Sequence, residues 1–166
     1  MTGITLIGMP ASGKSIIGRA LAKRLNFKFI DLDDLILEKE GRSHAEILAE
    51  SGKDKLLEIE EKYTLGLDLH NTVFSPGGSI IYSETAMKKL QNETLIFYLE
   101  LPLEKLKERL SNKVASRGIV GLEGKGIAGL FKERAPIYQK FAHHTINCTN
   151  LKDEDCIDEI LQHKKS

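Results

Sequence analysis

The segment from Gly8 to Ser15 restricts the fold of this 166-residue chain more than any other feature. Its sequence, GMPASGKS, matches the pattern G-x-x-x-x-G-K-[ST], with an apolar run at residues 4–7 before it and a helical apolar pattern at residues 16–25 after it. In this order of strand, loop and helix, the glycines let backbone N–H groups turn toward one anion at the positive end of the helix. The sequence therefore predicts a nucleoside triphosphate site, in which Lys14 reaches the outer phosphates and the Ser15 hydroxyl binds Mg²⁺.

Strand-like and helix-like segments alternate along the rest of the chain. Helices are expected between the strands. Residues 43–69 are expected to form two helices that are separated by a break near Gly52. Further strands are expected near residues 27–30, 73–75, 95–99 and 145–147. This alternation predicts an α/β fold, a three-layer sandwich in which helices flank a central parallel sheet. The chain length favours a single domain over residues 1–166.

Residues 111–126 form the segment with the least regular pattern. They contain four glycines, with Lys113, Arg117 and Lys125 among them. Glycine-rich, basic connections of this length are often mobile and functional. We therefore expect a candidate lid here rather than a packed element.

The composition excludes several kinds of partner. Lys plus Arg and Asp plus Glu both number 24, so no net charge draws the chain to nucleic acid or to an anionic membrane. The two cysteines, Cys148 and Cys156, are expected to be reduced, buried thiols. The chain starts without a basic and apolar signal segment and has no apolar run of about 20 residues, which favours a cytoplasmic protein without a membrane span. We also expect a monomer, and no zinc site at the histidine pair 143–144, which lacks a third ligand.

Two acids follow the second predicted strand. Asp31 and Asp33 would point to the same side of an extended segment, at the edge of the sheet where ligands of open α/β folds bind. One carboxylate can enter the Mg²⁺ shell and the other can accept a proton from an attacking hydroxyl. The alternative is that these acids only cap the next helix, a role that we assign to Asp34, before a helix expected from Leu35. A guanine-specific GTPase is disfavoured, because the Asn112-Lys113 pair lacks the expected following aspartate.

Several motifs together resemble the shikimate kinases, from about residue 3 to residue 150. After the phosphate loop, the chain has the family's sequence features in the family's order: Asp31-Leu32-Asp33, Gly41-Arg42-Ser43, Gly77-Gly78, Arg117 and Arg134-Ala135-Pro136-Ile137-Tyr138. The resemblance implies a P-loop kinase fold and an ATP-dependent transfer of phosphate to a hydroxyl of shikimate or a related hydroxy acid. It also implies ATP and Mg²⁺ as cofactors and an acceptor that bears a carboxylate.

The resemblance also implies a role for each matching residue. Lys14, Asp33 and Arg117 would be catalytic, and Ser15 and Asp31 would hold the metal. Asp33, Gly77, Gly78 and Arg134 would contact the acceptor, the last through its carboxylate. The nucleotide would be bound by Pro10, Ala11, Ser12, Gly13, Lys14, Ser15, Ile16, Arg109 and Arg117.

The chain departs from the family at the predicted acceptor site. Leu56-Leu57 aligns with a Phe-Arg pair whose arginine binds the shikimate carboxylate, and leucine cannot replace a bidentate contact. The family's three-glycine cluster is Pro76-Gly77-Gly78 here, and the lid has Arg117-Gly118-Ile119-Val120 where the family has Arg-Pro-Leu. Lys53, one helical turn before Leu57, is a candidate replacement cation, although an exposed lysine is usually only solvated.

Two other charged positions have ordinary interpretations. Glu60 and Glu61 are expected to be acids on a helix surface, although Glu60 aligns with a family glutamate near the acceptor. Arg134 is open to two interpretations, an acceptor ligand or a partner of Glu133 or another acid on its helix.

Two other functions remain open. A nucleoside monophosphate kinase shares the loop, the lid and the sheet, but it would need several arginines for a second phosphate. A degenerate kinase that only binds ATP, as a regulatory module, is suggested by the leucine at position 57. The presence of Lys14, Asp33 and Arg117 argues against a pure binder.

Overall fold

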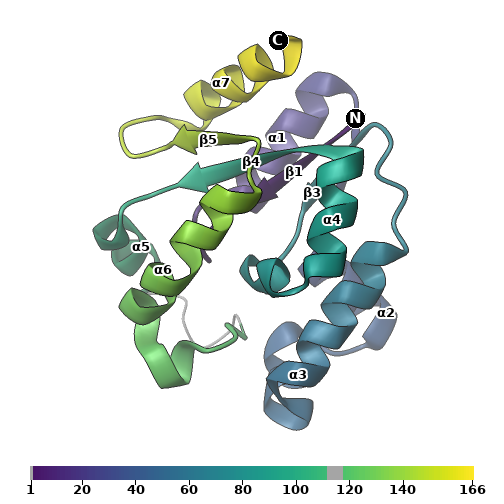
Figure 1. The fold of residues 1–166 in the computed structure, drawn as a ribbon, viewed down its shortest axis with the longest axis vertical. Helices are drawn as coiled ribbons and strands as arrows, with labels where there is room; N and C mark the ends of the chain where they lie inside the picture. The colour runs from purple at the N-terminus through teal and green to yellow at the C-terminus, as the bar shows by residue number, and fades with distance from the viewer. Residues whose placement is uncertain (1, 112–117) are drawn as a thin grey trace.

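A five-stranded parallel sheet forms the centre of the molecule in the computed structural model, which describes residues 2–111 and 118–166 (Figure 1). The strand order is β2-β3-β1-β4-β5, and each neighbouring pair is parallel. The strands are β1 (Gly3–Ile7), β2 (Lys28–Asp31), β3 (Thr72–Ser75), β4 (Thr94–Glu100) and β5 (His144–Asn147). All five predicted strands are therefore present, with ends that differ by at most one residue.

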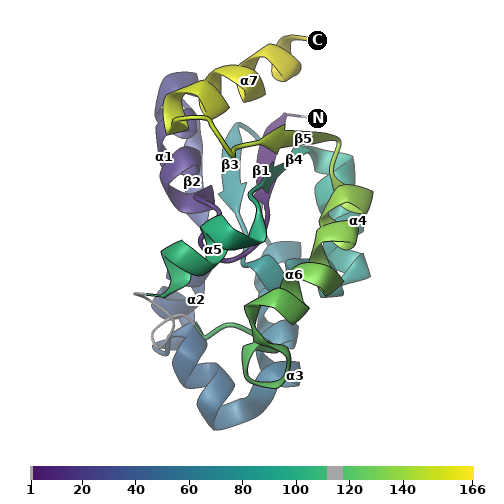
Figure 2. The same cartoon turned by 90° about the vertical axis from the view of Figure 1, so that its left-hand side faces the viewer.

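Helices cover both faces of the sheet. The α1 and α7 helices lie together on one side, whereas α4 and α6 pack on the other side against β4 (Figures 1 and 2). The helices of the described residues are α1 (Lys14–Leu25), α2 (Leu32–Glu40), α3 (His44–Leu65), α4 (Glu84–Glu93), α5 (Leu103–Leu110), α6 (Leu122–Phe141) and α7 (Asp153–Lys165), with a 3₁₀ helix η1 (Gly78–Tyr82) before α4. The predicted three-layer α/β class is confirmed. No helix within residues 2–111 and 118–166 is long and apolar enough to cross a bilayer.

The central strand β1 fixes the position of the phosphate loop. All five of its residues are buried, as expected for a parallel strand that is covered on both faces. In the sheet, β1 lies between β3 and β4. The chain goes from β1 toward the β2 edge of the sheet, and later from β3 across β1 to β4, so the strand order reverses direction at β1. Such a switch point opens a crevice at the carboxyl ends of the strands, where ligands of open α/β sheets bind. The loop that begins at Gly8 lies directly at this point.

The α3 helix bends at Gly52, as predicted. This glycine has φ 81° and ψ 173°, a backbone conformation that other residues rarely adopt. The bend divides α3 into two limbs that meet at an angle, at the bottom of the view in Figure 2. Residues from the two limbs can therefore face each other across the bend.

The structure corrects one local prediction, the start of the second helix. The α2 helix begins at Leu32 rather than near Leu35, so Asp33 lies in its first turn and not on an extended segment. The described end of the candidate lid is packed, since Val120 is buried in the core and α6 already begins at Leu122. Residues 112–117 lie outside the described residues.

Candidate functional site

A cleft of about 560 Å³ lies at the carboxyl ends of the strands. Its walls come from the loop after β1, the start of α2, both limbs of α3, η1 and α6. Every residue that was predicted to bind nucleotide, metal or acceptor lines this cleft, with the exceptions of Ser12 and Arg117. Ser12 is buried within the loop, and Arg117 lies outside the described residues.

Lys14 is folded onto the loop that precedes it. Its ammonium group donates to the carbonyl oxygens of Gly8 at 2.9 Å and Met9 at 2.8 Å. A buried ammonium needs such oxygen partners, and phosphate oxygens could serve in the same way. Arg109, from α5, reaches over the loop and donates to the Ala11 carbonyl at 3.1 Å. Two cations therefore lie at the part of the cleft formed by the loop.

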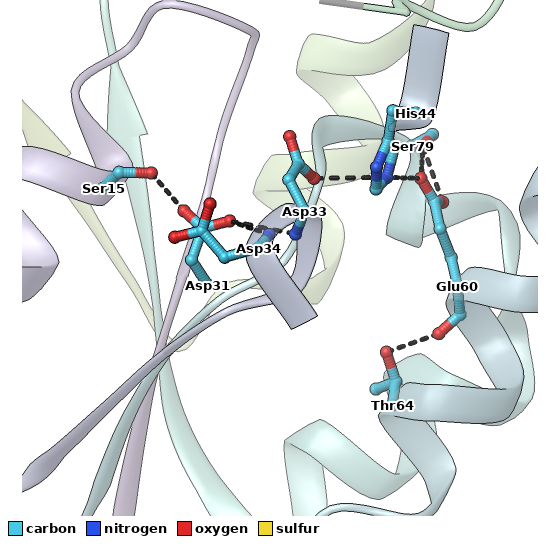
Figure 3. Close-up of polar contacts among 8 residues, drawn as sticks. All are labelled: Ser15, Asp31, Asp33, Asp34, His44, Glu60, Thr64 and Ser79. Atoms are coloured by element: carbon cyan, nitrogen blue, oxygen red, sulfur yellow. Dashed lines mark hydrogen bonds and ion pairs between the residues drawn. The ribbon is translucent and has the colours of Figure 1, made fainter. Parts of the chain in front are cut away.

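Ser15 and Asp31 meet at the edge of the same loop. The Ser15 hydroxyl donates to Asp31 Oδ2 at 2.5 Å, and Asp31 Oδ1 accepts from the backbone N–H groups of Asp33 and Asp34 (Figure 3). Asp31 is therefore the N-cap of α2, and the prediction that Asp34 caps this helix is wrong. The cap was placed too late because the helix was expected to begin later.

The Ser15–Asp31 pair fits a magnesium ion. Hydroxyl and carboxylate oxygens are the hard donors that Mg²⁺ prefers, and this ion is often held by one or two protein oxygens together with phosphates and water. The described residues contain no cluster of three or more His, Cys, Asp or Glu side chains that could hold a metal alone. This pair would therefore hold the ion jointly with a bound nucleotide.

Asp33 projects from the first turn of α2 toward the acceptor end of the cleft. Its Oδ1 lies 3.2 Å from Nε2 of His44. The pKa of Asp33 is raised above its ordinary value: burial raises it most, His44 opposes this rise, and the carboxylates of Asp31 and Glu60 add to it. Because 56% of the side chain is exposed, solvent limits the rise. The group is placed to accept a proton from a ligand hydroxyl.

Glu60 is buried, so the prediction of a surface acid is wrong. Its side chain is 1% exposed and accepts from the Ser79 hydroxyl at 2.7 and 2.9 Å and from Nε2 of His44 at 3.0 Å (Figure 3). Burial lowers the pKa of His44, but the hydrogen bond to Glu60 and the charges of Asp33, Glu60 and Asp31 together raise it above its ordinary value. The buried carboxylate of Glu60 is thus compensated by hydrogen bonds from Ser79 and His44, and it favours the charged form of the imidazole.

Arg134 closes the acceptor end of the cleft. It is 1% exposed, and it donates to the Val120 carbonyl at 2.8 Å and to the Tyr82 hydroxyl at 3.2 Å. Among the described residues it forms no ion pair with an acid, since Glu133 pairs with Lys125 instead. A Cβ at Gly78 would lie 3.0 Å from Nη1 of Arg134, so a larger residue here would crowd this guanidinium. The interpretation of Arg134 as a helix-surface partner of Glu133 is therefore wrong.

Sequence reasoning missed His44 and Ser79 and misplaced Glu60. The only available signal was the alignment of Glu60 with a family glutamate. Conversely, two residues that the sequence suggests for the acceptor site are absent from the cleft walls. Leu57 is half-buried against the core, and Lys53 is exposed.

Comparison with known proteins gives a consistent result. The family model described as "Shikimate kinase" matches residues 10–165. A shikimate kinase from Enterococcus faecalis is 32% identical over 167 residues, covering 99% of each chain, and one from Clostridium botulinum is 36% identical over 153 residues, covering 91% of this chain and 90% of the other.

Solved structures agree with the sequence relatives. A shikimate kinase from Acinetobacter baumannii, solved in complex with shikimate, has a TM-score of 0.88 and 26% identity, covering 99% of this chain and 93% of that one. The shikimate kinase from Aquifex aeolicus has a TM-score of 0.80 and 28% identity, and the match covers 99% of this chain and 96% of that one. With a family model that matches nearly the whole chain and relatives of this similarity, the chain belongs to the shikimate kinase family.

Proposed function

We propose that this protein transfers the γ-phosphoryl group of ATP to a hydroxyl group of shikimate or a closely related hydroxy acid. One observation carries the proposal: a single cleft joins a phosphate-binding loop to a carboxylate, Asp33, and a buried guanidinium, Arg134. Phosphoryl transfer needs this combination, because catalysis depends mainly on positioning and on stabilising charge between the two reacting oxygens.

The nucleotide is assigned to the loop end of the cleft. Backbone N–H groups of residues 10–16 would bind the phosphates, with Lys14 moving from its loop carbonyls to the phosphate oxygens. Ser15 and Asp31 would hold Mg²⁺, which supplies charge neutralisation on the phosphate oxygens. Arg109 would pack on the adenine. Arg117, which lies outside the described residues, stays a proposed phosphate contact on the basis of the sequence motif.

The acceptor is assigned to the opposite end. Asp33 would take the proton of the attacking hydroxyl, Gly77 and Gly78 would offer backbone groups, and Arg134 would pair with the carboxylate. A related protein of known structure was solved in complex with shikimate, which supports this choice of acceptor. The position of Leu57 off the cleft walls leaves Arg134 as the arginine at this end among the described residues. One guanidinium suits one carboxylate better than the second phosphate of a nucleoside monophosphate.

A coupled assay of ADP release tests the proposal. Wild-type protein is given ATP and Mg²⁺ with shikimate, with other hydroxy acids, or with nucleoside monophosphates. We expect ADP release that depends on shikimate or on another carboxylate-bearing hydroxy acid. Release that depends only on a nucleoside monophosphate would favour that kinase class, and ATP binding without turnover of any acceptor would favour a degenerate binder.

We also propose that the protein is a cytoplasmic monomer. The proposal is supported by the presence of only two cysteines, Cys148 and Cys156, which are too few for a disulfide framework. Light scattering after size-exclusion chromatography tests the monomer directly.

A further inference from the structure

Glu60 and His44 form a buried pair that the phosphate loop and the family motifs do not explain. A carboxylate that is 1% exposed is costly unless a positive partner and hydrogen bonds compensate it. Ser79 donates to both of its oxygens, and the described basic side chain in contact with it is His44, at 3.0 Å. The side chain of His44 is itself only 8% exposed. These two residues therefore form a buried contact inside the molecule and not a surface ion pair.

The bend at Gly52 makes this contact possible. His44 and Glu60 are 16 positions apart on α3. In a straight helix this separation would place them about 24 Å apart along the axis. Because Gly52 turns the second limb back toward the first, the two side chains meet at hydrogen-bond distance. The pair thus depends on one glycine in an unusual backbone conformation.

The same imidazole nitrogen also contacts Asp33. Nε2 of His44 lies 3.2 Å from Asp33 Oδ1 and 3.0 Å from Glu60 Oε1 (Figure 3). The hydrogen bond runs from Nε2–H to Glu60 Oε1, because a carboxylate oxygen accepts, and Asp33 Oδ1 lies beside the same nitrogen as an ion-pair contact. In the described part of the chain, Oδ2 of Asp33 receives no hydrogen bond and stays available to a ligand in the cleft. The charged groups that face this imidazole are Asp31 from β2, Asp33 from α2 and Glu60 from the second limb of α3.

We propose that His44 is a positioning residue for the reaction. The ion-pair contact of its Nε2 with Oδ1 of Asp33, at 3.2 Å, holds that oxygen so that Oδ2 faces the hydroxyl of the acceptor. Glu60, itself fixed by Ser79, holds the imidazole in turn. This inference rests on the proposed function, since it assigns to Asp33 the role of proton acceptor. The described polar contacts of His44 Nε2 are the two carboxylates, and Nδ1 is buried without a hydrogen-bond partner among the described residues. We therefore assign His44 to the positioning of Asp33 and not to direct binding of the acceptor.

Two substitutions at His44 test the proposal in the coupled assay. His44→Gln retains an N–H donor near the position of Nε2, whereas His44→Leu removes the donor. We expect His44→Leu to lower kcat by about ten- to a hundredfold with little change in the KM for ATP or acceptor, and His44→Gln to recover most of this loss. Because His44→Leu leaves Glu60 without a cation, His44→Leu/Glu60→Gln is the matched variant if the single one does not fold. His70→Gln, at an exposed histidine, is the control and should behave as wild type.

A double-mutant cycle separates positioning from a structural role. If His44 acts through Asp33, then His44→Leu should cost less than about twofold in kcat when Asp33 is already Asn. A further multiplicative loss in that background would overturn the proposal, as would equal rates of the Leu and Gln variants, or a loss confined to the acceptor KM. A wild type that turns over no acceptor would count against the proposed function instead. In that case the same cycle on the melting temperature of the ligand-free protein still decides the contact, since additive shifts would contradict it.

Discussion

Leu57 lies off the cleft walls, at the position where the sequence resemblance implies an arginine in the family. It lies on the second limb of α3, half-buried against the core. An arginine here could bury its stem in the same place and extend its guanidinium to the cleft. We expect Leu57→Arg to raise kcat/KM for shikimate by roughly ten- to a hundredfold, since a hydrogen bond to a charged group contributes about 1.5–3 kcal/mol.

The matched control for this change is Leu57→Lys. It adds the same charge without the planar fork that a carboxylate binds, so its gain should be smaller. The kinetic constants for shikimate in the three proteins decide the question. An efficient wild type that neither variant improves would show that Arg134 with the described cleft residues is sufficient for acceptor binding.

The His44 imidazole should make stability depend on pH. Its pKa is raised in the folded protein by Glu60, Asp33 and Asp31, so its stabilising effect is complete below the unfolded pKa of about 6.5 and is lost as pH rises through the folded pKa. We therefore expect the difference in free energy of unfolding between wild type and His44→Gln to be largest near pH 6 and to shrink toward pH 9. Denaturant unfolding across this range measures it. A difference that grows with pH would contradict the assigned contact.

At the residue scale, local signals identified the phosphate loop but not the Glu60 cluster. The loop is a contiguous motif, so residues 8–15 were recognisable without any tertiary information. Glu60 was expected on a helix surface, as acidic residues usually are. Its burial depends on Ser79 from η1 and His44 from the other limb of α3, which are 19 and 16 positions away. No local pattern contains that information.

At the scale of the elements, the α3 bend links a local break signal to the site. Gly52, which interrupts the helical pattern, was visible in the sequence. The direction of the second limb of α3 depends on its packing against neighbouring elements, which the sequence does not show. The start of α2 was misplaced for a related reason: β2 ends at Asp31, whose side chain caps α2 at once, without an intervening loop. The alternation of strands and helices was easier to predict, because buried parallel strands are continuous apolar runs.

The bend also makes a prediction about stability. Gly52 has no neighbour within 4 Å of an added Cβ, so Gly52→Ala would be destabilising through its backbone conformation and not through a clash. We expect a loss of about 1–3 kcal/mol in the free energy of unfolding, with a lower kcat because His44 and Glu60 separate. Gly124→Ala on α6, where added atoms also meet open space, is the control and should be neutral or slightly stabilising. Equal effects of the two changes would show that the bend is not held by Gly52.

At the scale of the whole molecule, the sheet order brings distant segments to one cleft. The phosphate loop follows β1, Asp33 follows β2, the glycines follow β3, and Arg134 comes from α6. Parallel strands end at the same edge, so residues more than a hundred positions apart contribute to one site. This arrangement could be predicted from the alternating pattern, whereas the exact walls of the acceptor end could not, because they depend on side-chain packing between α3, η1 and α6.

The most direct test of the account is ³¹P NMR of the complete reaction mixture. Wild-type protein with ATP, Mg²⁺ and shikimate should produce a phosphomonoester signal that grows in step with ADP, while inorganic phosphate stays low. Lys14→Ala should slow this signal by at least about a hundredfold, because it removes charge that stabilises the transferring phosphoryl group. ADP that appears with inorganic phosphate alone, or an unchanged rate in Lys14→Ala, would contradict phosphoryl transfer to a hydroxyl in this cleft.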